Sequence, residues 1–153
     1  MRNRLVRPLT APAGWQDLGR QVDESMQSRV WIRVAQPGDA GSLVRASSTG
    51  STKTVAQVLA YSGTSTTAPI VSVASAAELS KSAGHRTPTT TSSAGSWAVS
   101  LWSNKSSLTT GWTAPAGVTV RQYQGTTTYG GLTAIASQSG TMATMWTIVL
   151  NPR

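Results

Sequence analysis

Hydrophobic and polar residues alternate along most of the chain, which is the pattern of half-buried β-strands. Clusters of Gly, Pro, Ser and Thr separate the alternating segments at short intervals. The segments predict about eight strands, at residues 26–35, 42–46, 53–61, 70–74, 96–103, 118–123, 132–137 and 142–150. Two of them, 53–61 and 142–150, are apolar on both faces, so we expect both to be central in their sheets.

The segment 26–35 divides its side chains between two faces. Val30 lies on one face, whereas Arg29, Trp31 and Arg33 occupy every second position and share the other. This spacing can stack guanidinium groups on an indole and present a cationic, aromatic binding strip. It is also the pattern of a Trp that packs inside the fold beneath Arg side chains whose stems cover it.

A near-repeat indicates that the chain has two related halves. Residues 10–14 and 113–117 both read Thr-Ala-Pro-Ala-Gly. Pro fixes φ and Gly permits a positive φ, so each copy predicts a chain reversal between strands. A strand at 97–102 precedes the second copy, but only nine residues precede the first. The first half therefore lacks an opening strand, and we expect a neighbouring sheet edge to lie open for pairing with another chain.

The length of 153 residues suits one domain. We expect an all-β fold, a two-sheet antiparallel sandwich that is jelly-roll-like, with an opening strand that is missing or replaced by an N-terminal arm. Residues 1–8 form the basic arm in this interpretation, and residues 9–153 form a single β-sandwich domain.

Composition excludes several kinds of chemistry. The chain has no Cys and one His, so it carries no disulfide framework, thiol nucleophile or Cys-based zinc site. We expect no cofactor and no metal, because a His/Cys cluster and a multi-carboxylate loop are both lacking. No apolar run approaches the ~18 residues of a membrane span. Arg7 and Pro8 interrupt the apolar stretch that a secretory signal peptide needs, so we expect none.

The charge favours an anionic partner. Thirteen basic and five acidic residues give a formal net charge of +8, which suits an acidic protein surface, a phosphorylated polymer or nucleic acid. Arg2, Arg4 and Arg7 cluster at the start and, with Leu5 and Val6, make a candidate docking arm. The other charges are dispersed among Ser- and Thr-rich strands, which argues against nucleic acid.

A set of turn and strand motifs is spread from residue 12 to residue 146. The motifs are Pro12-Ala-Gly-Trp15, Val30-Trp-Ile-Arg-Val-Ala35, Gly38-Asp-Ala-Gly-Ser42, Leu59-Ala-Tyr-Ser-Gly63, Gly84-His-Arg-Thr-Pro88, Gly95-Ser-Trp97, Trp102-Ser-Asn-Lys-Ser106, Trp112-Thr-Ala-Pro-Ala-Gly-Val118, Tyr129-Gly-Gly131 and Ala143-Thr-Met-Trp146. Together they resemble a β-sandwich module of actinobacterial surface and secreted proteins and of virion proteins of actinobacterial phages. The resemblance covers roughly residues 9 to 150 and implies the sandwich fold, but it carries little about biochemistry.

Catalytic motifs are weak. His85, the single imidazole, lies in a polar loop, and the chain has no Gly-x-Ser-x-Gly nucleophile elbow. The five acidic residues show no arrangement that predicts the paired carboxylates of a glycosidase. We therefore expect a structural role for His85 and no enzymatic activity.

A second candidate surface comprises Trp102, Asn104, Lys105 and Trp112. Exposed indoles with polar neighbours would form a platform for a glycan. The alternative is that these Trp residues fill a core that has no Phe.

These features together favour a non-enzymatic structural or interaction protein of a phage virion. A capsid decoration or accessory protein, made in the host cytoplasm and docked through its arm and open edge, is the leading interpretation. Its partner would be the major capsid protein, another virion protein or a second copy of the chain. The alternatives are a carbohydrate-binding module of a cell-surface or secreted protein, with polysaccharide as partner, and a tail-associated adhesion protein.

Overall fold

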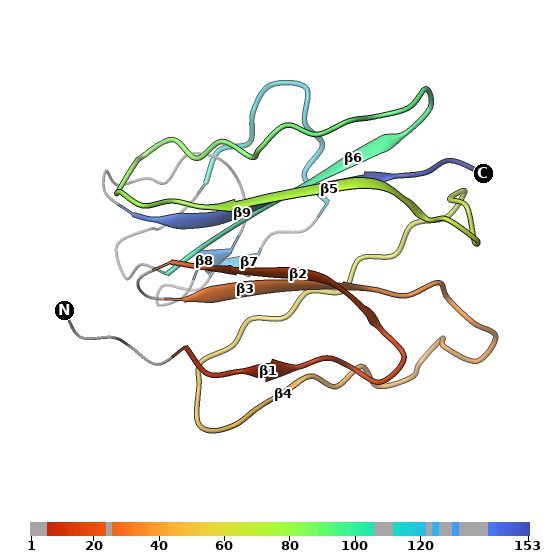
Figure 1. Cartoon of the computed structure of the whole chain (residues 1–153), viewed down its shortest axis with the longest axis horizontal. Coiled ribbons are helices and arrows are strands. Elements are labelled where there is room, and N and C mark those ends of the chain that lie inside the picture. The colour runs from red at the N-terminus through yellow and green to blue at the C-terminus, as the bar shows by residue number, and fades with distance from the viewer. Residues whose placement is uncertain (1–5, 24–25, 106–111, 122–123, 126–129, 132–140) are drawn as a thin grey trace.

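The computed structural model describes residues 6–23, 26–105, 112–121, 124–125, 130–131 and 141–153. Over these residues the chain is all-β, without a helix, and its strands form small antiparallel sheets (Figure 1). The strands are β1 (Leu9–Thr10), β2 (Gln16–Val22), β3 (Gln27–Ile32), β4 (Ser47–Ser48), β5 (Ile70–Ala77), β6 (Trp97–Asn104), β7 (Gln124–Gly125), β8 (Gly130–Gly131) and β9 (Ala143–Leu150).

The largest described sheet has the order β5-β9-β6, and β9 is its central strand. All eight residues of β9 are buried, because strands flank both of its edges and other segments cover both faces. The prediction of a central strand at the end of the chain is therefore confirmed. The expected strands at 70–74 and 96–103 correspond to β5 and β6.

The hairpin of β2 and β3 packs one face against this sheet. Trp146 on β9 donates from Nε1 to Ser28 Oγ at 2.8 Å, and Gln21 donates from Nε2 to Ser75 Oγ on β5 at 2.8 Å. The register of β2 shifts between Asp17 and Gly19, so β2 carries a bulge there. Gly19 has φ +127°, and a Cβ at this position would lie 3.4 Å from Trp146 Cη2. Glycine thus provides both the backbone conformation and the space for the indole.

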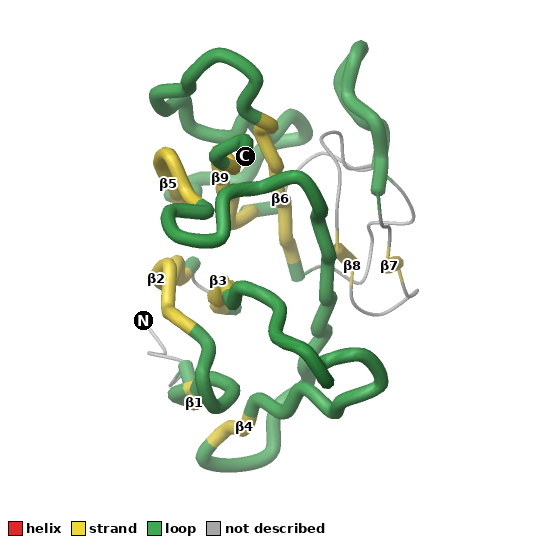
Figure 2. Tube along the Cα trace, turned by 90° about the vertical axis from the view of Figure 1, so that its right-hand side faces the viewer, coloured by secondary structure: helices red, strands yellow, loops and turns green. Residues whose placement is uncertain are grey.

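The opposite face of the hairpin covers the start of the chain. Gln27 donates from Nε2 to the carbonyl of Arg7, and Arg29 donates from Nη1 to the carbonyl of Leu9 at 2.9 Å. β1 in this segment pairs with β4. Figure 2 shows the three tiers one above another: the β5-β9-β6 sheet, the β2–β3 hairpin, and β1 with β4.

Several expected strands do not form. Residues 53–61 carry no strand, and Val58 is 59% exposed. Alternation alone does not make a strand, since a strand also needs a partner ladder, and both sides of β9 are already taken by β5 and β6. Residues 42–46 are also irregular and exposed. They follow two successive tight turns, which are closed by hydrogen bonds from Asp39 N–H to the Gln36 carbonyl and from Ser42 N–H to the Asp39 carbonyl.

Two further expected strands fall wholly or partly outside the described residues. Residues 118–121 are described and contain no strand, whereas 122–123 and 132–137 are not described. Conversely, the alternation did not predict β2, because Gly19 and the bulge break the period of two.

The repeated corners have the same geometry. Gly14 has φ +77° and Gly117 has φ +78°. In each copy the N–H of the residue after Gly donates to the Pro carbonyl at 3.2 Å. The predicted chain reversals are confirmed, with Gly at the third position of a turn that requires positive φ. The repeat does not extend to the strands: β2 follows the first corner, and residues 118–121 are irregular after the second.

Candidate functional site

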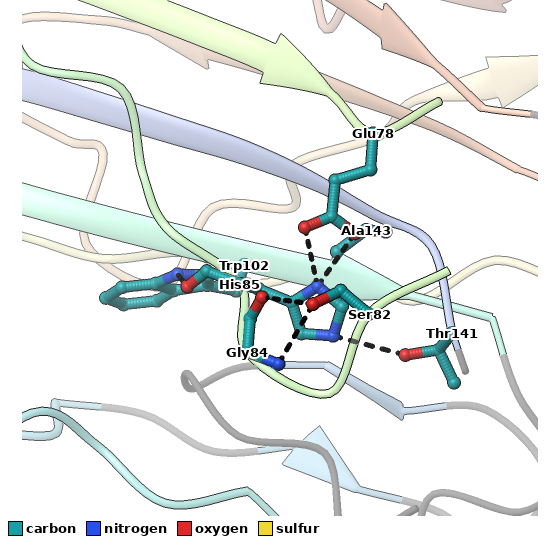
Figure 3. Close-up of polar contacts among 7 residues, drawn as sticks. All are labelled: Glu78, Ser82, Gly84, His85, Trp102, Thr141 and Ala143. Atoms are coloured by element: carbon teal, nitrogen blue, oxygen red, sulfur yellow. Dashed lines mark hydrogen bonds and ion pairs between the residues drawn. The ribbon is translucent and has the colours of Figure 1, made fainter. Parts of the chain in front are cut away.

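The only imidazole of the chain is buried in a polar cluster where the loop after β5 meets the start of β9 (Figure 3). His85 Nδ1 lies 2.9 and 2.8 Å from the two carboxylate oxygens of Glu78, and its Nε2 lies 3.2 Å from Thr141 Oγ1. A carboxylate only accepts, so Nδ1–H donates to Glu78. In the neutral ring Nε2 then accepts from the Thr141 hydroxyl.

Backbone bonds fix the same loop to β9. Glu78 N–H donates to the carbonyl of Ala143 at 3.0 Å, and Glu78 Oε2 accepts from Ala143 N–H at 2.9 Å. Ser82 and Thr141 exchange backbone bonds of 2.8 and 3.3 Å. Trp102 on β6 donates from Nε1 to the carbonyl of His85 at 3.0 Å. These bonds tie the 78–85 loop to β9 and β6.

Acid, imidazole and hydroxyl stand here in the order of a hydrolytic triad. The His85 side chain is 0% exposed, however, and Thr141 is 8% exposed. A nucleophile has to meet its substrate, and Thr141 faces the interior of the fold. The geometry thus explains the cluster as a structural one. Among the described residues no group of His, Cys, Asp and Glu could hold a metal ion.

Arg29 and Trp31 lie on the face of β3 that covers the start of the chain, and Arg33 follows directly after the strand. The Arg29 guanidinium lies 5.8 Å from the centre of the Trp31 ring, so the expected stacking is present. It also forms an ion pair with Asp17, and this hydrogen bond lowers the pKa of the Asp17 carboxyl and raises the pKa of Arg29.

Arg33 is paired as well, with Asp39 at 2.9 Å. Trp31 is half-buried and Arg29 reaches the backbone of Leu9. Both Arg side chains of the strip are thus ion-paired, and its Trp is half-buried.

The expected platform of Trp102, Asn104, Lys105 and Trp112 is not an exposed surface. Trp102 is 4% and Asn104 is 3% exposed, so the prediction that Trp102 is open to a glycan is wrong. Trp102 belongs to a core cluster with Ala143 and Met145, against which Trp112 packs. Lys105 is exposed. The physical reason is that these Trp residues fill a core in a chain without Phe.

The docking arm falls mostly outside the described residues, which include neither Arg2 nor Arg4 nor Leu5. Val6 is half-buried and Arg7 is exposed. Arg7 is nevertheless tied to the fold through its carbonyl and through its guanidinium, which lies against Gly50.

The sequence did not predict a groove that three distant segments line together. Its wall is residues 58–62, and its other two lining residues are Trp97 and Arg121. The groove has a volume of about 510 Å³. Tyr61 meets Trp97 edge to face, with ring centres 6.1 Å apart and planes at 78°. Burial raises the pKa of Tyr61, while the nearby charge of Arg121 opposes the rise.

In the sequence, the feature that could have pointed to this groove is Trp97. It is the first residue of β6, and its indole lies on the strand face opposite to that of the buried Trp102. Its neighbours in the groove lie 36 and 24 residues away along the chain, at Tyr61 and Arg121. Only folding brings the three together.

No family model matches the chain, and no curated protein or solved structure shows significant similarity to it. The described part of the chain contains no helix with the length and hydropathy that crossing a bilayer requires.

Proposed function

We propose that this chain is a structural protein of a phage virion without enzymatic activity, most simply a capsid decoration or accessory protein made in the host cytoplasm. Its finer fold in this proposal is a jelly-roll-like sandwich of two antiparallel sheets. The observation that carries the proposal is an open hairpin at the centre of the molecule.

β2 and β3 pair with each other and with no third strand in the described ranges. Their outer edges therefore carry N–H and C=O groups outside any ladder over seven and six residues. Such an edge is a template for a strand from another chain. Docking by strand addition suits a protein that assembles onto a larger particle.

The basic arm leads to this hairpin. The Arg7 and Leu9 carbonyls accept hydrogen bonds from side chains of β3, so the described start of the chain lies next to the hairpin. Their two Arg residues suit an acidic partner such as a capsid surface. The proposal accordingly assigns Arg2 and Arg4, with Leu5 and Val6, to contact with the partner.

Mass spectrometry of density-purified phage particles tests the proposal directly. A capsid decoration protein should be present at hundreds of copies per particle, because it would bind the many subunits of the capsid by strand addition. A few copies per particle would instead assign it to the tail. Absence from particles contradicts the proposal.

Deletion of residues 1–5 tests the arm. It leaves Arg7, whose carbonyl Gln27 holds, so the thermal unfolding midpoint should stay unchanged while occupancy on particles falls. Lys81→Gln, a charge removal at an exposed position outside the arm, serves as the control. Full occupancy of the deletion variant removes the arm from the proposal.

A second candidate function, glycan binding, is favoured by one specific observation. Trp97 is 52% exposed in the groove lined by residues 58–62 and Arg121. This site differs from the platform expected from the sequence.

A further inference from the structure

Trp97 presents its indole at an open groove with a fixed orientation. It begins β6, where it lies opposite Leu150 in the register of the sheet, and the ring of Tyr61 meets it edge to face. About half of the indole remains accessible, since the residue is 52% exposed. A rigid, half-open aromatic face can stack on a flat or ring-shaped ligand at low entropic cost.

Arg121 supplies a positive charge at the same groove. It is exposed and makes no ion pair with a described residue. The carboxylates of Asp17, Asp39 and Glu78 are already bound to other groups of the chain. An anion for Arg121 is therefore to be sought outside the described part of the molecule, and a guanidinium binds carboxylates through paired hydrogen bonds.

The remaining wall, residues 58–62, offers backbone groups and one hydroxyl for hydrogen bonds to a ligand. It belongs to no strand, so its backbone donors and acceptors are not committed to a sheet ladder. Ser62 adds a hydroxyl. Sugar hydroxyls donate and accept equally well, and so can use both kinds of backbone group.

We propose that this groove binds an acidic glycan, with one sugar ring stacked on Trp97 and its carboxylate paired with Arg121. The volume of about 510 Å³ lies in the range of small-ligand sites. The site rests on the second candidate function, glycan binding, and names its ligand class; it is independent of the virion role, the arm and the open hairpin. Either proposal can fail without the other.

Isothermal titration with galacturonate oligomers, and with neutral galactose oligomers of equal length, tests the site. The acidic oligomer should bind at least tenfold more tightly than the neutral one, because only it engages the guanidinium. Arg121→Gln should remove that preference, and Trp97→Ala should weaken binding of both oligomers. Arg45→Gln, the same charge change at another exposed position, should bind as the unaltered chain does.

Thermal unfolding of each variant shows whether it is folded, and Arg121→Gln keeps the test valid if Trp97→Ala unfolds. Equal binding of both oligomers, or unchanged binding by folded Arg121→Gln, overturns the proposal. So does binding of galactose 6-phosphate without binding of galacturonate, which would assign the groove to phosphate. Lack of binding by the unaltered chain overturns it outright.

Discussion

Each described carboxylate is engaged by a neighbour in its own chain. Asp17 and Asp39 pair with Arg29 and Arg33, Glu78 with His85, and Asp23 accepts from the N–H of Met26 at 2.8 Å. The few acids thus serve to fix turns and loops, and do not screen the many basic groups elsewhere. A net charge of +8 consequently remains for interactions with other molecules.

Replacing His85 by Leu should destabilise the fold. The change leaves Glu78 with only the Ala143 N–H as a described partner and removes the ring from Thr141. A buried polar group that loses its partner costs about 1 to 3 kcal/mol. Urea denaturation measures the loss. Lys81→Ala, in the same loop and exposed, should change stability by no more than about 0.5 kcal/mol; an equal effect of both substitutions would contradict the structural role of His85.

Asp17→Asn should lower stability at neutral pH by about 0.2 to 1 kcal/mol, the range of exposed ion pairs. The hydrogen bond from Arg29 lowers the pKa of Asp17 below its ordinary value of 3.8. The carboxylate therefore stabilises the fold fully above that value, and the contribution is lost as pH falls through the lower pKa of the folded state. Urea denaturation of both proteins at pH 7 and below pH 3 should show the difference shrinking; a constant difference would mean that the ion pair is not its source.

At the scale of elements, the contact between β2 and β9 depends on a single small residue. Gly19 combines a bulge, a positive φ and a close approach to Trp146. The indole of Trp146 in turn bonds to Ser28 on β3. One aromatic side chain from the central strand thus holds both strands of the hairpin against the sheet.

Gly19→Ala should accordingly cost about 1 to 3 kcal/mol, the usual range for a strained backbone conformation. Gly84→Ala is the matched control, because Gly84 has no positive φ and no atom within 4 Å of an added Cβ. The control should be neutral or stabilising by up to about 1 kcal/mol. Chemical denaturation compares the two, and equal costs would show that the bulge tolerates a side chain.

The sequence predicted strands correctly where the hydrophobic pattern coincides with β-branched or aromatic residues. β3 and β6 combine β-branched or aromatic residues with alternation, and β9 is a longer run that is apolar on both faces. Residues 53–61 alternate too, but β5 and β6 occupy the places beside β9. Which segments pair with β9 depends on the tertiary structure, so the hydrophobic pattern of one segment does not predict it.

The candidate site was less predictable for the same reason. His85 is buried, and its partners Glu78 and Thr141 follow no spacing rule. Trp102 and Trp97 lie five residues apart on one strand, and the sequence left open whether Trp102 forms a glycan platform or fills the core, while it gave Trp97 no role. Which face of β6 is covered depends on segments distant in the chain.

At the scale of the whole molecule, stability is concentrated in one strand. β9 is buried along its full length, whereas the irregular segments between residues 33 and 69 are mostly exposed or half-buried. One wall of the groove, residues 58–62, belongs to these outer segments. The molecule therefore combines a narrow rigid centre with an extensive surface for contacts.

Amide hydrogen exchange should follow this division. The amides of β9 should exchange slowest, those of β2 and β3 at intermediate rates, and those of residues 53–61 fastest, because protection follows burial and ladder bonding. Mass spectrometry of exchanged peptides measures the order. Protection of 53–61 equal to that of β9 would restore the central strand that the alternation predicted.

The place of β9 in the chain has a consequence for biosynthesis. β5 and β6 cannot form their sheet until β9, which is made after both, has left the ribosome. About 65 residues separate the end of β5 from the start of β9, which corresponds to roughly 3 to 13 s of translation at usual rates. During that time β5, which carries Val and Ile, lacks the strand with which it pairs in the described sheet. The nascent chain therefore exposes this strand to chaperones and to other newly made chains, whereas the finished protein does not.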